Sequence, residues 1–232
     1  MKRSFEAEFL DLGPSHYSQE EYDDCLHQLS RIGRFLGGDK ATLQALDKLP
    51  NPETILDVGC GGGQFAIKLA IRFPHSQIIG IDISSQAIDF AKKRLMERSI
   101  NNVAFEITPS LQLPFPPNSI DVVTSTLVCH HLTDRELVDF LKNAYQTAKQ
   151  SVIINDLHRH WFAYFGFKLI AKLFFKNRLI SHDGLLSIKR SFTKREWINY
   201  LKAAEIPLER CSITWNWAFR WVLHIDASKW EE

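Results

Sequence analysis

The stretch Ile55-Leu56-Asp57-Val58-Gly59-Cys60-Gly61-Gly62-Gly63 decides the fold of this 232-residue chain. It begins as an apolar strand with one acidic residue, turns on alternating glycines, and leads into an apolar helix that starts near Gln64. Glycine is needed where the backbone turns tightly and approaches a ligand so closely that a Cβ would intrude. The helix start behind the turn offers unpaired N–H groups and the positive end of a dipole. The stretch therefore predicts a doubly wound sheet that binds a nucleotide-like cofactor.

Strands and helices alternate from Thr54 onward, which is typical of an α/β fold with a mostly parallel sheet and helices on both faces. The expected strands cover residues 54–58, 77–81, 103–107, 120–126 and 151–155, and two strand-like runs, 213–217 and 219–225, close the chain. We expect one domain over residues 1–232, made of a helical N-terminal cap (1–50), a cofactor-binding core (54–155), a helical insertion (157–192), and a C-terminal helix and strands (193–232).

The amino-acid composition limits the kinds of molecule that this protein is expected to bind and the compartment in which it is expected to work. The 28 basic and 27 acidic side chains give a net charge of +1, so no nucleic-acid partner is expected from the total charge. The four cysteines are scattered without the spacing of a zinc site, and reduced thiols are typical of a cytosolic protein. Acids rather than an apolar run follow the N-terminus, and no stretch reaches the uncharged length of a membrane span. We therefore expect a cytoplasmic protein.

The spacing of the glycines distinguishes the known kinds of nucleotide-binding loop from one another. A phosphate-binding loop would need Gly-Lys-Ser/Thr, which is absent, and the order Gly59-x-Gly61-x-Gly63 differs from the GxGxxG of dinucleotide enzymes. The next strand ends at Asp82, 19 residues after Gly63, where a carboxylate can accept both hydroxyls of a ribose. The two strand ends together predict a site for a nucleoside whose other end is anionic, and argue against a nicotinamide-dependent oxidoreductase.

With these residues the chain resembles the class I S-adenosylmethionine-dependent methyltransferases. The matching motifs are 56–63, 80–84, 113–115 with 119–123, and 129–132. The resemblance implies a seven-stranded Rossmann-like sheet. It implies that the loop from Gly59 to Gly63, including Cys60 and Gly61, cradles the methionine part of S-adenosylmethionine. It also implies that Asp82 binds the ribose and Ile83 packs on the adenine.

Three further residues complete the expected cofactor site. Asp57 precedes the first glycine, and Leu127 follows the strand 120–126. Related sequences carry Gly-Asp-Ala where this chain has Thr108-Pro109-Ser110, so the adenine contact is expected from the backbone or from Ser110. A protein that binds the cofactor without catalysis remains an alternative because this acid is missing.

Methyl transfer needs an acceptor that has lost its proton, and histidine is the usual group that takes it. Four histidines follow strand ends, namely His130, His131, His158 and His160. We predict that His158 or His182, paired with a carboxylate, is the base. Two adjacent histidines do not make a metal site without a third ligand, so no metal is predicted.

The segment 161–175 is strongly apolar, with Lys168, Lys172 and Lys176 four residues apart along one helical face. It is interpreted as a lid over an apolar acceptor pocket, as a core helix, or as a peripheral membrane contact with the lysines reaching the surface. The lid favours a small, hydrophobic acceptor.

The later part of the chain is similar to bacterial methyltransferases encoded beside type III polyketide synthases, in the motifs 34–38, 155–160, 177–184 and 190–193. That similarity implies O-methylation of hydroxylated, alkyl-bearing aromatic or pyrone products. Taken together, the sequence predicts an S-adenosylmethionine-dependent methyltransferase acting on a small apolar or aromatic molecule, most plausibly at oxygen. Methylation of RNA or protein is the alternative.

Overall fold

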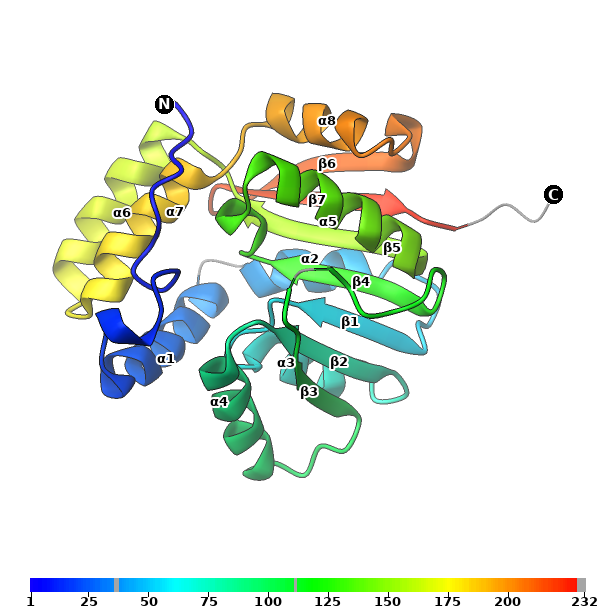
Figure 1. Ribbon diagram of the computed structural model, residues 1–232, viewed down its shortest axis with the longest axis horizontal. Coiled ribbons are helices and arrows are strands. Elements are labelled where there is room, and N and C mark those ends of the chain that lie inside the picture. Colours follow the sequence, from blue (N-terminus) through cyan, green and yellow to red (C-terminus); the bar gives the residue numbers. More distant parts are fainter. Residues whose placement is uncertain (36–37, 111, 229–232) are drawn as a thin grey trace.

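The structure is a computed structural model that describes residues 1–35, 38–110 and 112–228 (Figure 1). Its seven-stranded sheet has the order β3-β2-β1-β4-β5-β7-β6. The strands are β1 (Thr54–Val58), β2 (Gln77–Asp82), β3 (Val103–Ile107), β4 (Ile120–Thr126), β5 (Ala148–Leu157), β6 (Cys211–Asn216) and β7 (Arg220–Asp226). Strands β1 to β5 pair in parallel, whereas β7 pairs antiparallel with both β5 and β6. The predicted α/β fold with a mostly parallel, seven-stranded sheet is confirmed.

Helices cover both faces of this sheet. They are α1 (Gln19–Phe35), α2 (Gly38–Leu46), α3 (Gln64–Arg72), α4 (Ser85–Met96), α5 (Asp134–Thr147), α6 (Trp161–Phe174), α7 (Gly184–Arg190) and α8 (Lys194–Ala203). Side chains of α2, α3 and α4 pack on one face, and those of α5 and α8 pack on the other. Figure 1 shows α1, α6 and α7 grouped beyond one edge of the sheet, with the N-terminal segment running beside them.

Capping interactions between residues close in sequence define where several helices begin. Ser84 caps α4 by accepting from the Ala87 N–H, and Thr193 forms a capping box with Glu196 at the start of α8. Helix α2 begins at Gly38, and the Asp39 carboxylate in its first turn pairs with Lys68 of α3. Strand β5 is longer than predicted because antiparallel β7 supplies partners as far as Leu157. That extension brings Asp156 and Leu157 into the sheet.

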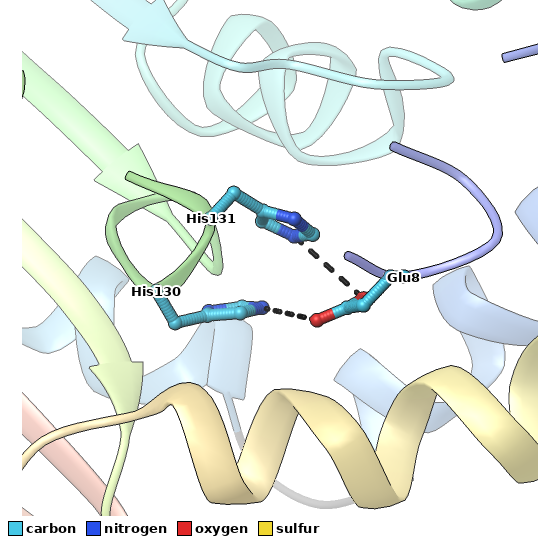
Figure 2. A group of neighbouring side chains, drawn as sticks. All are labelled: Glu8, His130 and His131. Atoms are coloured by element: carbon cyan, nitrogen blue, oxygen red, sulfur yellow. Dashed lines mark ion pairs between the residues drawn. The ribbon is translucent and has the colours of Figure 1, made fainter. Parts of the chain in front are cut away.

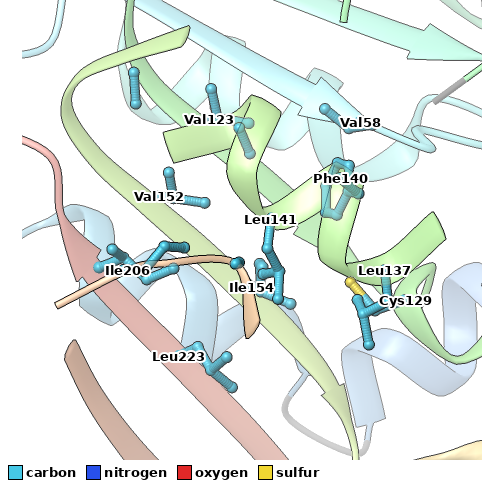
Figure 3. Close-up of a cluster of buried hydrophobic side chains, with 14 of the residues drawn as sticks. Val58, Val123, Cys129, Leu137, Phe140, Leu141, Val152, Ile154, Ile206 and Leu223 are labelled. Carbon is cyan, nitrogen blue, oxygen red and sulfur yellow. The ribbon is translucent and has the colours of Figure 1, made fainter. Parts of the chain in front are cut away.

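The larger apolar core fixes the strand ends at the edge where the glycines turn. Val58, Val123, Val152 and Ile154 of the three neighbouring strands β1, β4 and β5 lie against Leu141 and its neighbours on α5, all fully buried (Figure 3). Close packing of this kind tolerates little change in volume. The loops that follow β1, β4 and β5 therefore start from a rigid base.

Helix α6 is exposed rather than buried. Among its described side chains only Ala171 is buried, which excludes the core-helix interpretation. The others include seven exposed large apolar side chains: Trp161, Phe162, Phe165, Leu169, Ile170, Leu173 and Phe174. None of the helices in the described ranges is long and apolar enough to cross a membrane. The four cysteines are free thiols.

Candidate functional site

The glycine loop, residues 59–63, is held at the end of β1 by its neighbour strand. The backbone N–H groups of Gly59 and Cys60 both donate to the Ile81 carbonyl, over 2.8 and 3.0 Å. Gly59, Gly61 and Gly63 have φ angles of 71°, 51° and 71°, a region that L side chains rarely adopt. A Cβ on Gly59 would lie 2.3 Å from Val128 Cγ2, whereas one on Gly61 would meet no atom within 4 Å. The loop is thus tight on one side and open at Gly61.

Asp82 lies beside this open position. Its Oδ2 accepts from the Gly61 N–H over 2.8 Å, and its Oδ1 accepts from the Ser84 N–H over 2.9 Å. Each carboxylate oxygen has a second lone pair, so the group can still accept two hydroxyl protons. The next residue, Ile83, has 62% of its surface exposed. Ser110 is also exposed, with its Oγ accepting from the Gln112 N–H over 3.2 Å.

Asp57 is a buried carboxyl group with an unsatisfied oxygen. It is 2% exposed, and within the described residues its Oδ2 has no hydrogen-bond partner. Burial raises the pKa of Asp57 to about 8, and the negative charges of Asp82 and Asp39 add to the shift. A buried unpaired polar atom is costly. The site therefore favours a ligand that brings a positive charge to Asp57.

A cavity of about 470 Å³ joins the glycine loop to the helices beyond the sheet edge. Of the predicted cofactor residues, those that line it are Asp57, Gly59, Cys60, Gly61 and Leu127, while Gly63, Asp82, Ile83 and Ser110 lie outside its lining. Leu127 has a φ of 60°, an uncommon conformation for a residue with a side chain. The apolar wall opposite the loop comes from α1, α6 and α7: Leu26, Leu29, Ile32, Phe162, Phe167, Ile170 and Ile188.

Arg220, the first residue of β7, also lines the cavity and was not predicted. It is 2% exposed, and within the described part of the chain its Nε and Nη1 have no hydrogen-bond partner. Its guanidinium lies so close to Gly38 that an added Cβ there would be 2.8 Å from Cζ. The sequence pattern of the strand does not show that Arg220 faces the cavity, because the pairing of β7 with β5 decides where Arg220 lies.

The two predicted bases have different positions. His158 lines the cavity, but burial lowers its pKa to about 4, helped by the positive charges of His160 and Arg159. A group of that pKa takes a proton from a hydroxyl poorly. His182 lies outside the lining and its Nδ1 is 2.8 Å from Asp183 Oδ1. The Asp183 carboxylate in turn accepts from two backbone N–H groups of the N-terminal segment, at Phe9 and Leu10.

Three other side chains meet at the cavity: Glu8, His130 and His131, here called the His–Glu cluster (Figure 2). His130 Nε2 lies 3.8 Å from Glu8 Oε1, and His131 Nε2 lies 4.0 Å from Glu8 Oε2. The absence of a third donor was the sequence argument against a metal site. In the fold the N-terminal segment supplies that donor, from a position 122 residues before His130.

Carboxylates orient both imidazoles of the cluster. His130 Nδ1 lies 2.7 Å from Asp156 Oδ1, and His131 Nδ1 lies 2.8 Å from Asp11 Oδ1. Burial alone would raise the pKa of Asp156, but the His130 charge and hydrogen bond, with two backbone N–H donors, hold it below its ordinary value. Asp156 is thus an ionised acceptor, and the same reasoning holds for Asp11, whose pKa is also lowered. Each Nδ1 therefore carries the hydrogen, and each Nε2 is turned to Glu8.

Glu8 is the buried acid of the cluster. Burial raises its pKa to about 7, although His131, Ser187 and Arg190 act in the opposite direction. The Ser187 hydroxyl donates to Glu8 Oε1 over 2.9 Å. The Arg190 guanidinium lies 4.0 Å from the same oxygen. The carboxyl group is therefore fixed in position by two neighbouring polar groups.

Comparison with known proteins agrees with this geometry. The profile of a family described as "Methyltransferase domain" matches residues 55–151. The chain is 34% identical over 112 residues to a demethylmenaquinone methyltransferase of Deinococcus radiodurans, covering 48% of this chain and 45% of that one. It is 32% identical over 104 residues to the 27-O-demethylrifamycin SV methyltransferase of Amycolatopsis mediterranei, covering 42% and 38%. The chain thus spans less than half the length of these curated relatives.

Among solved structures, the plantazolicin methyltransferase BpumL in complex with SAH superposes with a TM-score of 0.68 at 18% identity, covering 93% of this chain and 91% of that one. Residues 55–151 thus match a methyltransferase domain, and the fold of the chain is that of solved S-adenosylmethionine-dependent methyltransferases. The unsatisfied Asp57 oxygen and the open side of Gly61 fit a ligand with an ammonium group and a chain that passes close to the backbone.

The raised pKa of Asp57 gives a testable dependence of stability on pH. Between about pH 4 and pH 8 the folded protein keeps a proton that the unfolded chain has released, so rising pH lowers the free energy of unfolding. The loss has a limiting slope of about 1.4 kcal/mol per pH unit. The variant Asp57→Asn removes this group, and urea unfolding of both proteins at several pH values measures the difference. A difference that does not change with pH would contradict the assignment.

Proposed function

We propose that this chain transfers the methyl group of S-adenosylmethionine to a hydroxyl oxygen of a small, largely apolar molecule. The observation that carries the proposal is that one continuous cavity joins the glycine loop, the apolar wall of α1 and α6, and the His–Glu cluster. Donor and acceptor must be held in line and away from water for a direct displacement. A cavity with a donor loop at one end and proton-accepting groups at the other meets that need.

Charged groups in the cavity complement the two ends of an amino acid. Asp57 would hold the ammonium group of the donor, and Arg220 would hold its carboxylate, since both side chains are buried with unsatisfied atoms. Asp82 would accept the ribose hydroxyls, and Ile83 would cover the adenine. When bound, S-adenosylmethionine supplies a methyl group on a positively charged sulfur. Backbone groups near Ser110 remain the proposed adenine contact.

The acceptor hydroxyl would lie at the His–Glu cluster, the polar end of the acceptor space. This replaces His158 and His182 as the groups that prepare the acceptor, because His158 titrates near pH 4 and His182 lies outside the cavity lining. Oxygen is favoured over carbon or nitrogen because the cluster lies where it can promote loss of the acceptor's proton, which a hydroxyl needs before attack. The similarity to enzymes encoded beside type III polyketide synthases points the same way.

A substitution of Asp82 tests the proposal that this residue binds S-adenosylmethionine. Asp82→Asn should weaken S-adenosylmethionine binding by roughly 10- to 100-fold, since a hydrogen bond to a charged group contributes about 1.5–3 kcal/mol. Asp89→Asn, at an exposed position on neighbouring α4, is the matched control and should leave the affinity unchanged. Isothermal titration calorimetry measures both. Equal affinities for the two variants would remove Asp82 from the site.

The acceptor class is tested with resorcinol and its alkylated homologues. An alkyl chain on the apolar wall contributes about 0.8 kcal/mol per buried methylene, so three more methylenes should raise kcat/KM by roughly 50-fold. Radiolabelled methyl transfer, with the product oxygen identified by mass spectrometry, provides the measurement. Labelling of RNA or protein fractions from a cell extract, with no label in the organic phase, would contradict a small-molecule acceptor.

Helix α6 also supports peripheral contact with an anionic membrane. It has the cavity on one side, through Phe162 and Phe167, and exposed apolar side chains on the other. Its sequence contains Lys168 and Lys172 and no acidic residue. Lysines near an anionic surface contribute about 1 kcal/mol each. Such a contact would let a lipophilic acceptor enter the cavity without crossing water.

Vesicle sedimentation measures this contact. The double variant Leu169→Asp/Leu173→Asp should bind phosphatidylglycerol vesicles at least about 10-fold more weakly than the unchanged protein, because it places two charges on the apolar face. The control Ile71→Asp alters a side chain of similar exposure, 60% against 63% and 67%, on α3. If all three proteins bind equally, α6 is not the contact surface.

A further inference from the structure

We infer that the His–Glu cluster is a binding site for one divalent transition-metal ion, with Glu8, His130 and His131 as its protein ligands. The inference rests on the proposed function, because it names how the acceptor end of the cavity would act. The three donor atoms lie within 4.8 Å of one another. Two imidazole nitrogens and one carboxylate oxygen are ligands that zinc and its neighbours prefer.

The orientation of the imidazoles is the strongest observation. Each Nδ1 donates its hydrogen to a carboxylate, His130 to Asp156 and His131 to Asp11. In a neutral imidazole the other nitrogen then carries a bare lone pair. Both Nε2 atoms face the carboxylate oxygens of Glu8, which are also acceptors (Figure 2). A divalent cation placed between them would be bound by both nitrogens and the carboxylate at once.

The distances between the histidine Nε2 atoms and the Glu8 oxygens distinguish a shared cation from a direct hydrogen bond. The Nε2-to-Glu8 distances of 3.8 and 4.0 Å are too long for an N–H···O bond, which lies at about 2.7–3.2 Å. Two ligands of one zinc ion, each about 2.0–2.2 Å from it, are separated by roughly 3.0–3.6 Å. Small side-chain rotations would bring the three donors to that spacing.

The surroundings match those of metal sites in proteins. Metal-bound histidines commonly donate their other N–H to a carboxylate, which fixes the ring and increases its basicity. Here both histidines do so, and Ser187 fixes the carboxylate of Glu8. The Arg190 guanidinium lies 4.0 Å from Glu8 and 2.5 Å from Asp11, and Asp156 contacts His130, so each group around the three donors is itself held in place.

The cavity gives the ion a function. All three ligands line it, so the positions not filled by protein would face the acceptor space. A bound cation lowers the pKa of an oxygen that coordinates it. The acceptor O–H bond then breaks and its proton goes to solvent water. The oxygen electron pair forms the bond to the methyl carbon while the methyl–sulfur bond breaks, with that pair remaining on sulfur.

Zinc binding to the chelator-treated, full-length protein is the direct test. Calorimetry with ZnCl2 should give one tight site, and Co2+ should bind there with the visible absorption of a nitrogen- and oxygen-ligated ion. Glu8→Gln should weaken Zn2+ binding by roughly 100-fold or more, beyond the 10–100-fold that loss of a second-shell partner costs. If that variant fails to fold, His131→Gln serves, because His131 is only partly buried. His75→Gln, at an exposed histidine, is the control.

Activity then separates the failure of this inference from failure of the proposed function. Metal-free enzyme should bind S-adenosylmethionine normally, lose methyl transfer to a hydroxylated acceptor, and regain it on adding Zn2+ or another divalent ion. Full activity in protein shown to be metal-free by elemental analysis would overturn the metal site and leave the methyltransferase function intact. So would equal Zn2+ affinity in Glu8→Gln and His75→Gln. Loss of cofactor binding itself would instead count against the proposed function.

Discussion

The candidate site depends on one buried cation, Arg190. Its guanidinium donates to the backbone carbonyls of Glu6, His130 and His131 over 2.9, 3.1 and 2.8 Å, and to the Asp11 carboxylate over 2.5 Å. These partners belong to the N-terminal segment and to the turn after β4, while Arg190 ends α7. Removing one partner of such a buried, charged network costs about 3–5 kcal/mol, since the other charges are left uncompensated. Three distant parts of the chain therefore meet at one place.

This dependence explains which parts of the site could be predicted. The glycine loop, Asp57 and Asp82 follow from local patterns, since strand period, turn glycines and helix start lie within 30 residues of one another. The strands β1, β3 and β4 have the predicted bounds for the same reason. Glu8 meets His130 only because Arg190 and Asp183 hold the N-terminal segment across the sheet edge. No periodicity in the sequence encodes a contact of that kind.

The histidines predicted as catalytic bases show the same limit of prediction from sequence. His158 and His182 stand next to carboxylates or strand ends in the sequence, which made both plausible bases. His158 packs between His160 and Trp221, with ring centroids 5.2 and 4.8 Å away, and within the described residues its Nδ1 has no hydrogen-bond partner. The Nδ1 of His130 has a carboxylate partner in Asp156, which belongs to the neighbouring strand β5 and not to its own segment. Pairing across strands, and not adjacency in sequence, decides which imidazole is oriented.

Burying polar groups without partners costs free energy that a binding site can recover when a ligand binds. Asp57 and Arg220 are each almost fully buried, with unsatisfied atoms facing one cavity. In an ordinary core such groups would be replaced by apolar side chains, because each costs free energy when unpaired. A donor with an ammonium and a carboxylate would satisfy both at once, so folding stability would be exchanged for binding free energy. The same reasoning applies to the opposite end of the cavity, where a cation would be held by the three donor groups of the His–Glu cluster. The polar groups at both ends then leave only the apolar wall, made largely by α1 and α6, to select the acceptor.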